Sequence, residues 1–218
     1  MPDLPLSPTP RTGIRHIIFD LGGVLLNIDY GATEKAFEAL GIVNFNALYS
    51  QLQQTPLFDD LETGRASREA FVEAIQKALP APVSEEKIIA AWNAMLLDFP
   101  LRRLQVLQQL RLYYDLFLLS NTNEIHEEAF TKTLMATCGF NTIAHFFDKV
   151  YFSHRVGLRK PGRKVFELIL NENGLRPEHT LFIDDSPQHI ETAKSLGIQT
   201  IYLENGMTIE DHIFLPKQ

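Results

Sequence analysis

The chain has 218 residues, 45% of them hydrophobic and 22% charged, a composition typical of globular proteins that excludes disordered and fibrous classes. Its formal net charge of -7 argues against nucleic-acid binding, because such proteins concentrate lysine and arginine on one face. No apolar run approaches the ~18 residues that a membrane span needs. The single cysteine, Cys138, cannot form an internal disulfide and suits a cytoplasmic protein.

A proline-rich stretch precedes HIIFDLGGVL, the first segment with a clear pattern. Residues 1–14 contain four prolines, so we expect a short, loose tail there. Ile17, Ile18 and Phe19 are consecutive apolar residues before a glycine pair, which predicts a strand buried on both faces. Asp20 follows where the ligand crevice of a parallel sheet lies, although a strand-end Asp also commonly caps a turn.

Residues 31–99 have the pattern of a helical insert. Apolar residues recur at helical spacing in four segments: 33–41, 45–54, 67–80 and 83–97. Gly41 is the expected end of the first segment, and Ser67 and Ser84 are the expected N-caps of the last two. The stretch shows no convincing strand, so we expect a compact helical bundle.

Predicted helices and strands alternate from Pro100 onward. We expect helices over 100–111, 159–174 and 187–196, and strands over 116–119, 149–153, 181–183 and 197–205. This alternation predicts an α/β fold with a doubly wound, parallel, Rossmann-like sheet and a helical bundle inserted after its first strand. The predicted domains are the tail 1–14, an α/β core of 15–30 and 100–218, and the helical insert 31–99.

Polar residues follow the predicted strands or lie in adjoining loops: Asp20, Ser120 with Asn121, Lys160, and Asp184 with Asp185. Parallel strands present their carboxyl ends at one edge of the sheet, so we expect these side chains to converge. Converging carboxylates repel one another unless a cation lies among them, and an all-oxygen site suits Mg²⁺. Lys160 and the Ser120 hydroxyl would then offer a positive charge and a donor to a phosphate.

Four motifs in this order carry a family resemblance: FDLGG, LLSNT, RKP and FIDD. Together they resemble the signature of the haloacid dehalogenase superfamily, specifically its magnesium-dependent phosphatases with a helical cap. DLGGVL, LSNTN, YFSHRVGLRKP and FIDDSPQHI look closest to the branch that includes bacterial α-D-glucose-1-phosphate phosphatases and the phosphatase domain of soluble epoxide hydrolase. The resemblance covers nearly the whole chain beyond the tail.

The resemblance implies a nucleophile and a metal site. Asp20 would attack phosphorus to give an aspartyl phosphate that water hydrolyses, which splits one displacement into two. Magnesium would be held by the carboxylates of Asp20 and Asp185 and the backbone carbonyl of Gly22. Asp184 would lie next to these ligands without binding the ion directly.

The resemblance also implies a phosphate site. The Ser120 hydroxyl and the N–H of Asn121 would hold phosphate oxygens, and Lys160 would neutralise both the phosphate and Asp20. A Ser-Asn pair after a strand is also ordinary turn chemistry. Asp184 can likewise be read as structural.

Gly22 departs from the family pattern. Most phosphatases of the family carry a second Asp at this position as general acid and base. A backbone carbonyl can still bind the metal, but the proton-transfer role is lost, at a cost of roughly 10²- to 10⁴-fold. A sugar 1-phosphate, whose anomeric oxygen leaves readily, needs such an acid less, which makes it the favoured hypothesis among small phosphorylated metabolites.

Other functions remain open at this point. A catalytically inactive member that binds phosphate or a protein partner would also lack the second Asp. A phosphomutase needs the acid and base that Gly22 removes, and a hydrolytic dehalogenase works without metal and does not need Asp184 and Asp185.

The polar loop FDDLETGRAS of the insert would overhang the site. Glu62 and Arg65 in it are candidate substrate contacts, or alternatively parts of a turn and a solvated face. His154 and Arg155 precede Lys160 and could approach the site. Trp92 lies on the apolar face of its helix and is read as core.

Overall fold

The computed structural model describes residues 12–42, 45 and 56–214, and its centre is a five-stranded parallel sheet. The strands are β1 (His16–Phe19), β2 (Asp115–Ser120), β3 (Lys149–Phe152), β4 (Thr180–Asp184) and β5 (Gln199–Tyr202). Their order across the sheet is β3-β2-β1-β4-β5, so β1 is the central strand and the chain winds outward from it in both directions. The predicted doubly wound α/β fold is confirmed.

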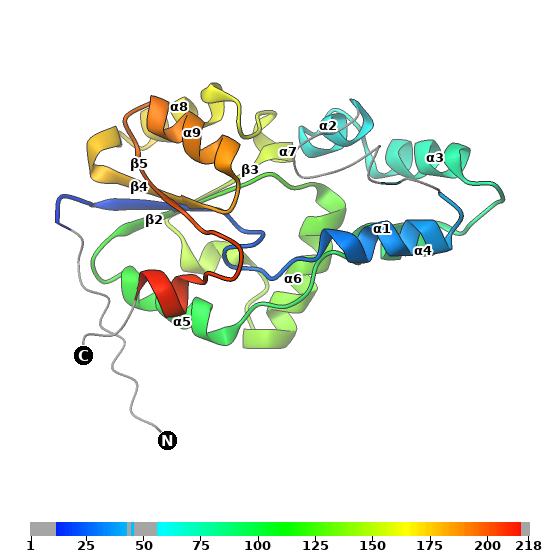
Figure 1. Cartoon of the computed structure of the whole chain (residues 1–218), viewed down its shortest axis with the longest axis horizontal. Coiled ribbons are helices and arrows are strands. Elements are labelled where there is room, and N and C mark those ends of the chain that lie inside the picture. The colour runs from blue at the N-terminus through cyan, green and yellow to red at the C-terminus, as the bar shows by residue number, and fades with distance from the viewer. Residues whose placement is uncertain (1–11, 43–44, 46–55, 215–218) are drawn as a thin grey trace, which may run out of the picture.

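Helices cover both faces of this sheet (Figure 1). The helices of the chain are α1 (Tyr30–Ala39), α2 (Pro56–Glu62), α3 (Arg68–Ala78), α4 (Glu85–Asn93), α5 (Leu101–Leu110), α6 (Glu124–Cys138), α7 (Ser153–Val156), α8 (Arg163–Glu172) and α9 (Pro187–Ser195), with short turns η2 (Ile143–Phe146), η3 (Pro177–His179) and η4 (Ile209–Ile213). α5 and α6 lie on one face of the sheet, and α8 and α9 lie on the other.

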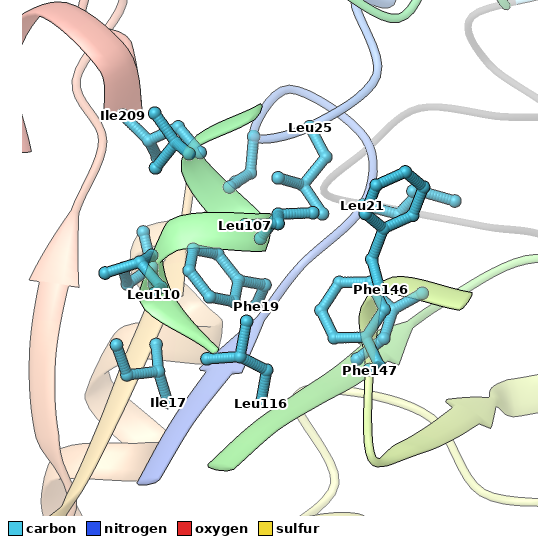
Figure 2. Packing of buried hydrophobic residues seen from close by; sticks show 14 of the residues in the cluster. Ile17, Phe19, Leu21, Leu25, Leu107, Leu110, Leu116, Phe146, Phe147 and Ile209 are labelled. Atoms are coloured by element: carbon cyan, nitrogen blue, oxygen red, sulfur yellow. The ribbon is translucent and has the colours of Figure 1, made fainter. Parts of the chain in front are cut away.

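The alternating direction of strand side chains explains the two faces. Ile17 and Phe19 of β1 point toward the cluster that contains Leu107 and Leu110 of α5, as Figure 2 shows. Ile18, between them, joins the opposite cluster with residues of α8 and α9. All three side chains are at most 1% exposed, which is why the strand reads as a continuous apolar run.

Helices α1 to α4, called the insertion below, follow β1 and lie at one end of the molecule (Figure 1). They share a separate aromatic core in which Phe37, Phe58, Phe71 and Trp92 are each at most 1% exposed. The interpretation of Trp92 as a core residue is therefore confirmed. Residues 46–54 of the predicted helical segment 45–54 and residues 1–11 of the predicted tail 1–14 lie outside the described residues.

Both predicted N-cap serines lie at the N-cap positions of their helices, but only one of them makes a capping hydrogen bond, and one helix was not predicted. Ser67 caps α3 by accepting a hydrogen bond from the N–H of Ala70, but Ser84, at the N-cap of α4, makes no such side-chain bond. The sequence analysis also missed α6, the helix that follows β2. Its face toward the protein includes a buried His126, while Met135 is 52% exposed, so its apolar periodicity is weak.

Within the described ranges, no helix is both long enough and apolar enough to cross a bilayer.

Candidate active site

The site begins at Asp20, the first residue after β1. Its backbone N–H donates to the carbonyl of Ile183 in β4 at 3.0 Å, which continues the strand pairing one residue beyond β1. Asp20 therefore sits at the carboxyl edge of the central strand, and it is only 8% exposed. The sheet thus holds a carboxylate with little contact with water.

Lys160 lies between two of the site's carboxylates. Its Nζ is 2.7 Å from Asp20 Oδ1 and 2.7 Å from Asp184 Oδ2, and the side chain is completely buried. Burial opposes the charge on the ammonium, but the carboxylates of Asp184 and Asp20 outweigh it and raise the pKa of Lys160 above its usual value. Lys160 is therefore a fixed positive charge beside Asp20.

Asp184, at the end of β4, accepts hydrogen bonds from several donors. The backbone N–H of Ser186 donates to its Oδ1 at 2.8 Å, and His189 Nδ1 lies 2.9 Å from the same oxygen. Burial would raise the pKa of this carboxyl, but Lys160 and His189 lower it to about 2. Burial in turn lowers the pKa of His189. Asp184 is thus an ionised anchor that holds Lys160 in place.

Asp20 has the opposite electrostatic situation. Burial raises the pKa of its carboxyl to about 8, against the lowering effect of Lys160, and the charges of Asp184 and Asp185 push it in the same direction as burial. The three acids offer oxygen atoms that all lie within 4.8 Å of one another, as the sequence analysis expects. The cluster combines three carboxylates with one ammonium, so an added divalent cation would neutralise it.

The glycine pair after Asp20 lets the loop approach Asp185. Gly23 has φ +73°, and a Cβ on it would lie 2.2 Å from Asp185 Oδ2. Only glycine fits this position without displacing the acid. A Cβ on Gly22 would instead lie 3.1 Å from Cδ1 of Ile28, so Ile28 occupies the space next to Gly22.

Ser120 ends β2 and Asn121 follows it. Ser120 is 3% exposed, and its hydroxyl lies 3.4 Å from the Asn121 carbonyl oxygen. The Asn121 side chain binds the backbone of Lys160, a contact that the sequence did not indicate. It accepts the N–H of Lys160 and donates to the Lys160 carbonyl, both at 2.9 Å, and so fixes the main chain of that residue.

A small cavity of about 50 Å³ opens between these residues and the insertion, enough for a few water molecules or a small polar group. Gly22, Ser120 and Asn121 line it from the sheet side, and Tyr30 and Glu62 line it from α1 and α2. Burial and the charges of neighbouring acids raise the pKa of Tyr30 well above its usual value, so its phenol keeps its proton and can donate.

The two candidate contacts from the insertion have different positions. Glu62 is 4% exposed and lines the cavity. Arg65 does not line it; the Arg65 guanidinium is 55% exposed and pairs with Asp59 at 2.5 Å and with Asp60 at 2.6 Å. The position of Glu62 suits contact with a ligand in the cavity, whereas Arg65 forms ion pairs at the protein surface.

His154 and Arg155 both bind Glu127 of α6. His154 Nε2 is 3.1 Å from Glu127 Oε2, and Arg155 pairs with Oε1 of the same residue. Although burial would raise it, these two partners lower the pKa of the Glu127 carboxyl. They line a hollow at the junction of α2 and α6 with Gly64 and Arg65, separate from the cavity that Ser120, Tyr30 and Glu62 line.

The sequence analysis assigned no role to two residues that bind the site's acids. His189 follows Asp184 by five residues in the first turn of α9, and its position within FIDDSPQHI was the available signal. Arg159 precedes Lys160 within RKP and pairs with Glu62, a contact that no local pattern indicates.

Comparisons with known proteins agree with this geometry. Residues 14–197 match the family model of haloacid dehalogenase-like hydrolases. D-ribitol-5-phosphate phosphatase of Bacteroides thetaiotaomicron is 30% identical over 197 residues, which cover 88% of this chain and 93% of that protein. Bifunctional epoxide hydrolase 2 of Sus scrofa is 32% identical over a stretch of 62 residues, which covers 28% of this chain and 11% of that protein.

A solved structure is also similar over almost the full length. It is a haloacid dehalogenase family enzyme from Bacteroides thetaiotaomicron in complex with magnesium and inorganic phosphate, with a TM-score of 0.83 and 33% identity over 93% of this chain and 100% of that one. With the fold, the four motifs and the carboxylate cluster in agreement, the chain belongs to the haloacid dehalogenase-like hydrolase family.

Proposed function

We propose that the chain is a magnesium-dependent phosphatase that hydrolyses a small phosphorylated sugar or polyol, with Asp20 as the nucleophile. The observation that carries the proposal is the contact between Asp20 and the fully buried Lys160 at 2.7 Å, at the end of the central strand. A positive charge fixed there can balance a phosphate as well as the acid that attacks it. The similarity to a D-ribitol-5-phosphate phosphatase supports the same reaction class.

The donor set suits magnesium. Carboxylates and backbone carbonyls are its preferred ligands in proteins. Asp20, Asp185 and the Gly22 carbonyl would hold the ion, because Asp184 already accepts from Lys160, His189 and a backbone N–H. When bound, magnesium supplies positive charge that keeps Asp20 ionised and draws the phosphate against it.

The reaction then proceeds in two displacements. An Asp20 oxygen forms a bond to phosphorus while the bond from phosphorus to the leaving oxygen breaks, which gives an aspartyl phosphate and a leaving oxygen that takes a proton from water to become the alcohol. Water next attacks phosphorus, the bond to Asp20 breaks, and inorganic phosphate is released. The Ser120 hydroxyl, the Asn121 N–H and Lys160 would hold the phosphate oxygens throughout.

Gly22 bears on the identity of the leaving group. Ile28 occupies the space beside Gly22, so no acid stands at this position to protonate the leaving oxygen. An anomeric oxygen leaves without much help, which favours a sugar 1-phosphate, whereas the similarity to the D-ribitol-5-phosphate enzyme favours a primary alcohol phosphate. Enzymes can accelerate hydrolysis of phosphate monoesters up to ~10²¹-fold, whereas a general acid contributes roughly 10²- to 10⁴-fold. Either substrate class is therefore compatible with the loss of this proton donor.

The insertion would serve as a cap. Glu62 reaches the cavity from α2 and can accept hydrogen bonds from substrate hydroxyls, while the apolar wall excludes water. The proposed domains remain a core of residues 15–30 and 100–218 and a cap of 31–99. The single cysteine, Cys138, is half-buried and supports a cytoplasmic location.

The leading alternative is a family member that binds phosphate without catalysis, and only Gly22 favours it. The test is phosphate release by the purified protein from D-ribitol 5-phosphate, glucose 1-phosphate and glucose 6-phosphate, with magnesium or with excess chelator, beside Asp20→Asn. We expect activity only with magnesium, and a loss of at least about 10³-fold in Asp20→Asn. Wild-type release no greater than that of the variant on every compound would refute the enzyme hypothesis.

The same panel separates the two substrate classes. Faster turnover of glucose 6-phosphate than of glucose 1-phosphate would reject the sugar 1-phosphate hypothesis. Activity that persists in excess chelator would reject the metal assignment.

A further inference from the structure

Arg159 directly precedes Lys160, the residue with the most contacts described above at the site. The next residue, Lys160, has its side chain held between Asp20 and Asp184, and its main chain is bound on both sides by the Asn121 amide. The backbone of Arg159 is therefore fixed relative to the nucleophile. Any group that the Arg159 side chain binds is placed relative to Asp20 as well.

The guanidinium of Arg159 binds two acids of α2. Its Nη1 donates to Asp59 Oδ1 at 3.1 Å, and its Nη2 lies 3.0 Å from Glu62 Oε2. Residues three apart lie on the same face of a helix, so one planar guanidinium can reach both carboxylates. The Glu62 side chain is 6% exposed and that of Arg159 is 22% exposed, so this pair is poorly screened by water.

Arg65 provides a natural contrast. It binds Asp59 as well, but from the solvent side, and its second partner is Asp60 rather than Glu62. Exposed pairs of this kind contribute little, because water and salt screen them. Arg159 therefore contacts the Glu62 carboxylate directly, whereas the carboxylates that Arg65 binds are those of Asp59 and Asp60.

We propose that Arg159 is a positioning residue that holds the Glu62 carboxylate in the cavity, where it selects leaving groups that carry hydroxyl groups. The inference rests on the phosphatase function proposed above and extends it to the basis of specificity. A hydroxyl of the substrate can donate to the Glu62 carboxylate, whereas a leaving group without hydroxyls gains no such hydrogen bond. Because Arg159 adjoins Lys160, the ion pair joins phosphate binding to closure of the insertion.

The experiment compares Arg159→Gln, Glu62→Gln and the double variant, with Arg65→Gln as the matched control. Each is assayed with magnesium on D-ribitol 5-phosphate, which has hydroxyls on its leaving group, and on p-nitrophenyl phosphate, which has none. We expect Arg159→Gln and Glu62→Gln each to raise KM for the polyol phosphate about tenfold with kcat changed less than about threefold. The double variant should be no worse than either single one, and Arg65→Gln should stay within about twofold of wild type.

Two results would overturn the inference. Equal losses on both compounds in Arg159→Gln would mean that Arg159 acts through Lys160 rather than through Glu62. Additive effects in the double variant would mean that Arg159 and Glu62 act independently.

A binding measurement keeps this test separate from the proposed function. If the wild type hydrolyses neither compound, the proposed function fails. The affinity for D-ribitol 5-phosphate is therefore also titrated by calorimetry in an Asp20→Asn background, which needs no turnover. Affinity that falls about tenfold with Arg159→Gln and stays constant with Arg65→Gln supports the inference, and affinity unchanged by Arg159→Gln refutes it.

Discussion

His126 of α6 makes the stability of the protein depend on pH. The imidazole is 6% exposed, its Nε2 lies 3.2 Å from the carbonyl oxygen of Trp92, and its ring stacks on the Trp92 ring at a centroid distance of 4.5 Å. Burial lowers the pKa of His126 from 6.5 to about 4. The neutral ring, with its proton on Nε2, is therefore the form that the folded protein accepts.

The lowered pKa of His126 determines whether the free energy of unfolding rises or falls with pH. The unfolded chain binds a proton below about pH 6.5 and the folded protein only below about pH 4, so the free energy of unfolding falls as pH decreases through this window. Each pKa unit corresponds to about 1.4 kcal/mol, which gives a loss of about 2 kcal/mol between pH 7.5 and pH 5. The cation–π interaction of a charged imidazole with the Trp92 ring would offset on the order of 1 kcal/mol of this loss. The net decrease in the free energy of unfolding is then about 1 to 2 kcal/mol.

The measurement is urea unfolding at several values of pH from 7.5 to 5, in the presence of chelator, for wild type and His126→Gln. Glutamine keeps a donor for the Trp92 carbonyl but does not titrate. Because Asp20 and His189 titrate equally in both proteins, the difference between the two curves isolates His126. Trp92, the only tryptophan of the chain, also reports the transition by its fluorescence. Curves that stay parallel within about 0.5 kcal/mol would refute the reasoning.

Two glycine positions allow sharp tests of the loops around the site. Gly23→Ala should raise the magnesium concentration needed for activity at least about tenfold, because the new Cβ would lie 2.2 Å from Asp185 Oδ2. Gly22→Ala, whose new Cβ has its nearest contact at 3.1 Å, should change that concentration less than about threefold. A titration of activity with magnesium compares the two variants, and equal shifts would contradict the explanation. Gly64→Ala, with φ +70° and a Cβ 2.2 Å from the His154 carbonyl oxygen, should destabilise the fold by about 1 to 3 kcal/mol, and an unchanged urea midpoint would show that this contact is not tight.

Much of the α/β core could be predicted because its signals are local. Strand β1 is buried on both faces, so its side chains form a continuous apolar run that no exposed residue interrupts. The acids after β1 and β4 could be assigned to one site because parallel strands end at the same edge. Helix α6 escaped prediction because a histidine takes a core position in it, which no apolar pattern reveals.

Side-chain partners were harder to predict than positions. Lys160 was expected to neutralise a phosphate and Asp20, but its second contact, with Asp184, depends on how the loop before α8 packs against the ends of β1 and β4. Arg159 and Asp59 are 100 residues apart, and two other arginines that bind acids of this region, Arg65 and Arg155, carry the same charge. Charge in the sequence cannot distinguish these arginines, because their roles are decided by burial.

The segment from Ser153 to Lys160 contacts both the insertion and the core. Its first turn, α7, presents the His154 carbonyl against Gly64 of the insertion, and its last two residues bind Glu62 and Asp20. A movement of the insertion away from the sheet would break the contacts at both ends of this short segment. Under the proposed function, the charge that would balance the phosphate and the acid that would meet the leaving group are set by adjacent residues. Specificity and chemistry would then depend on the same short segment.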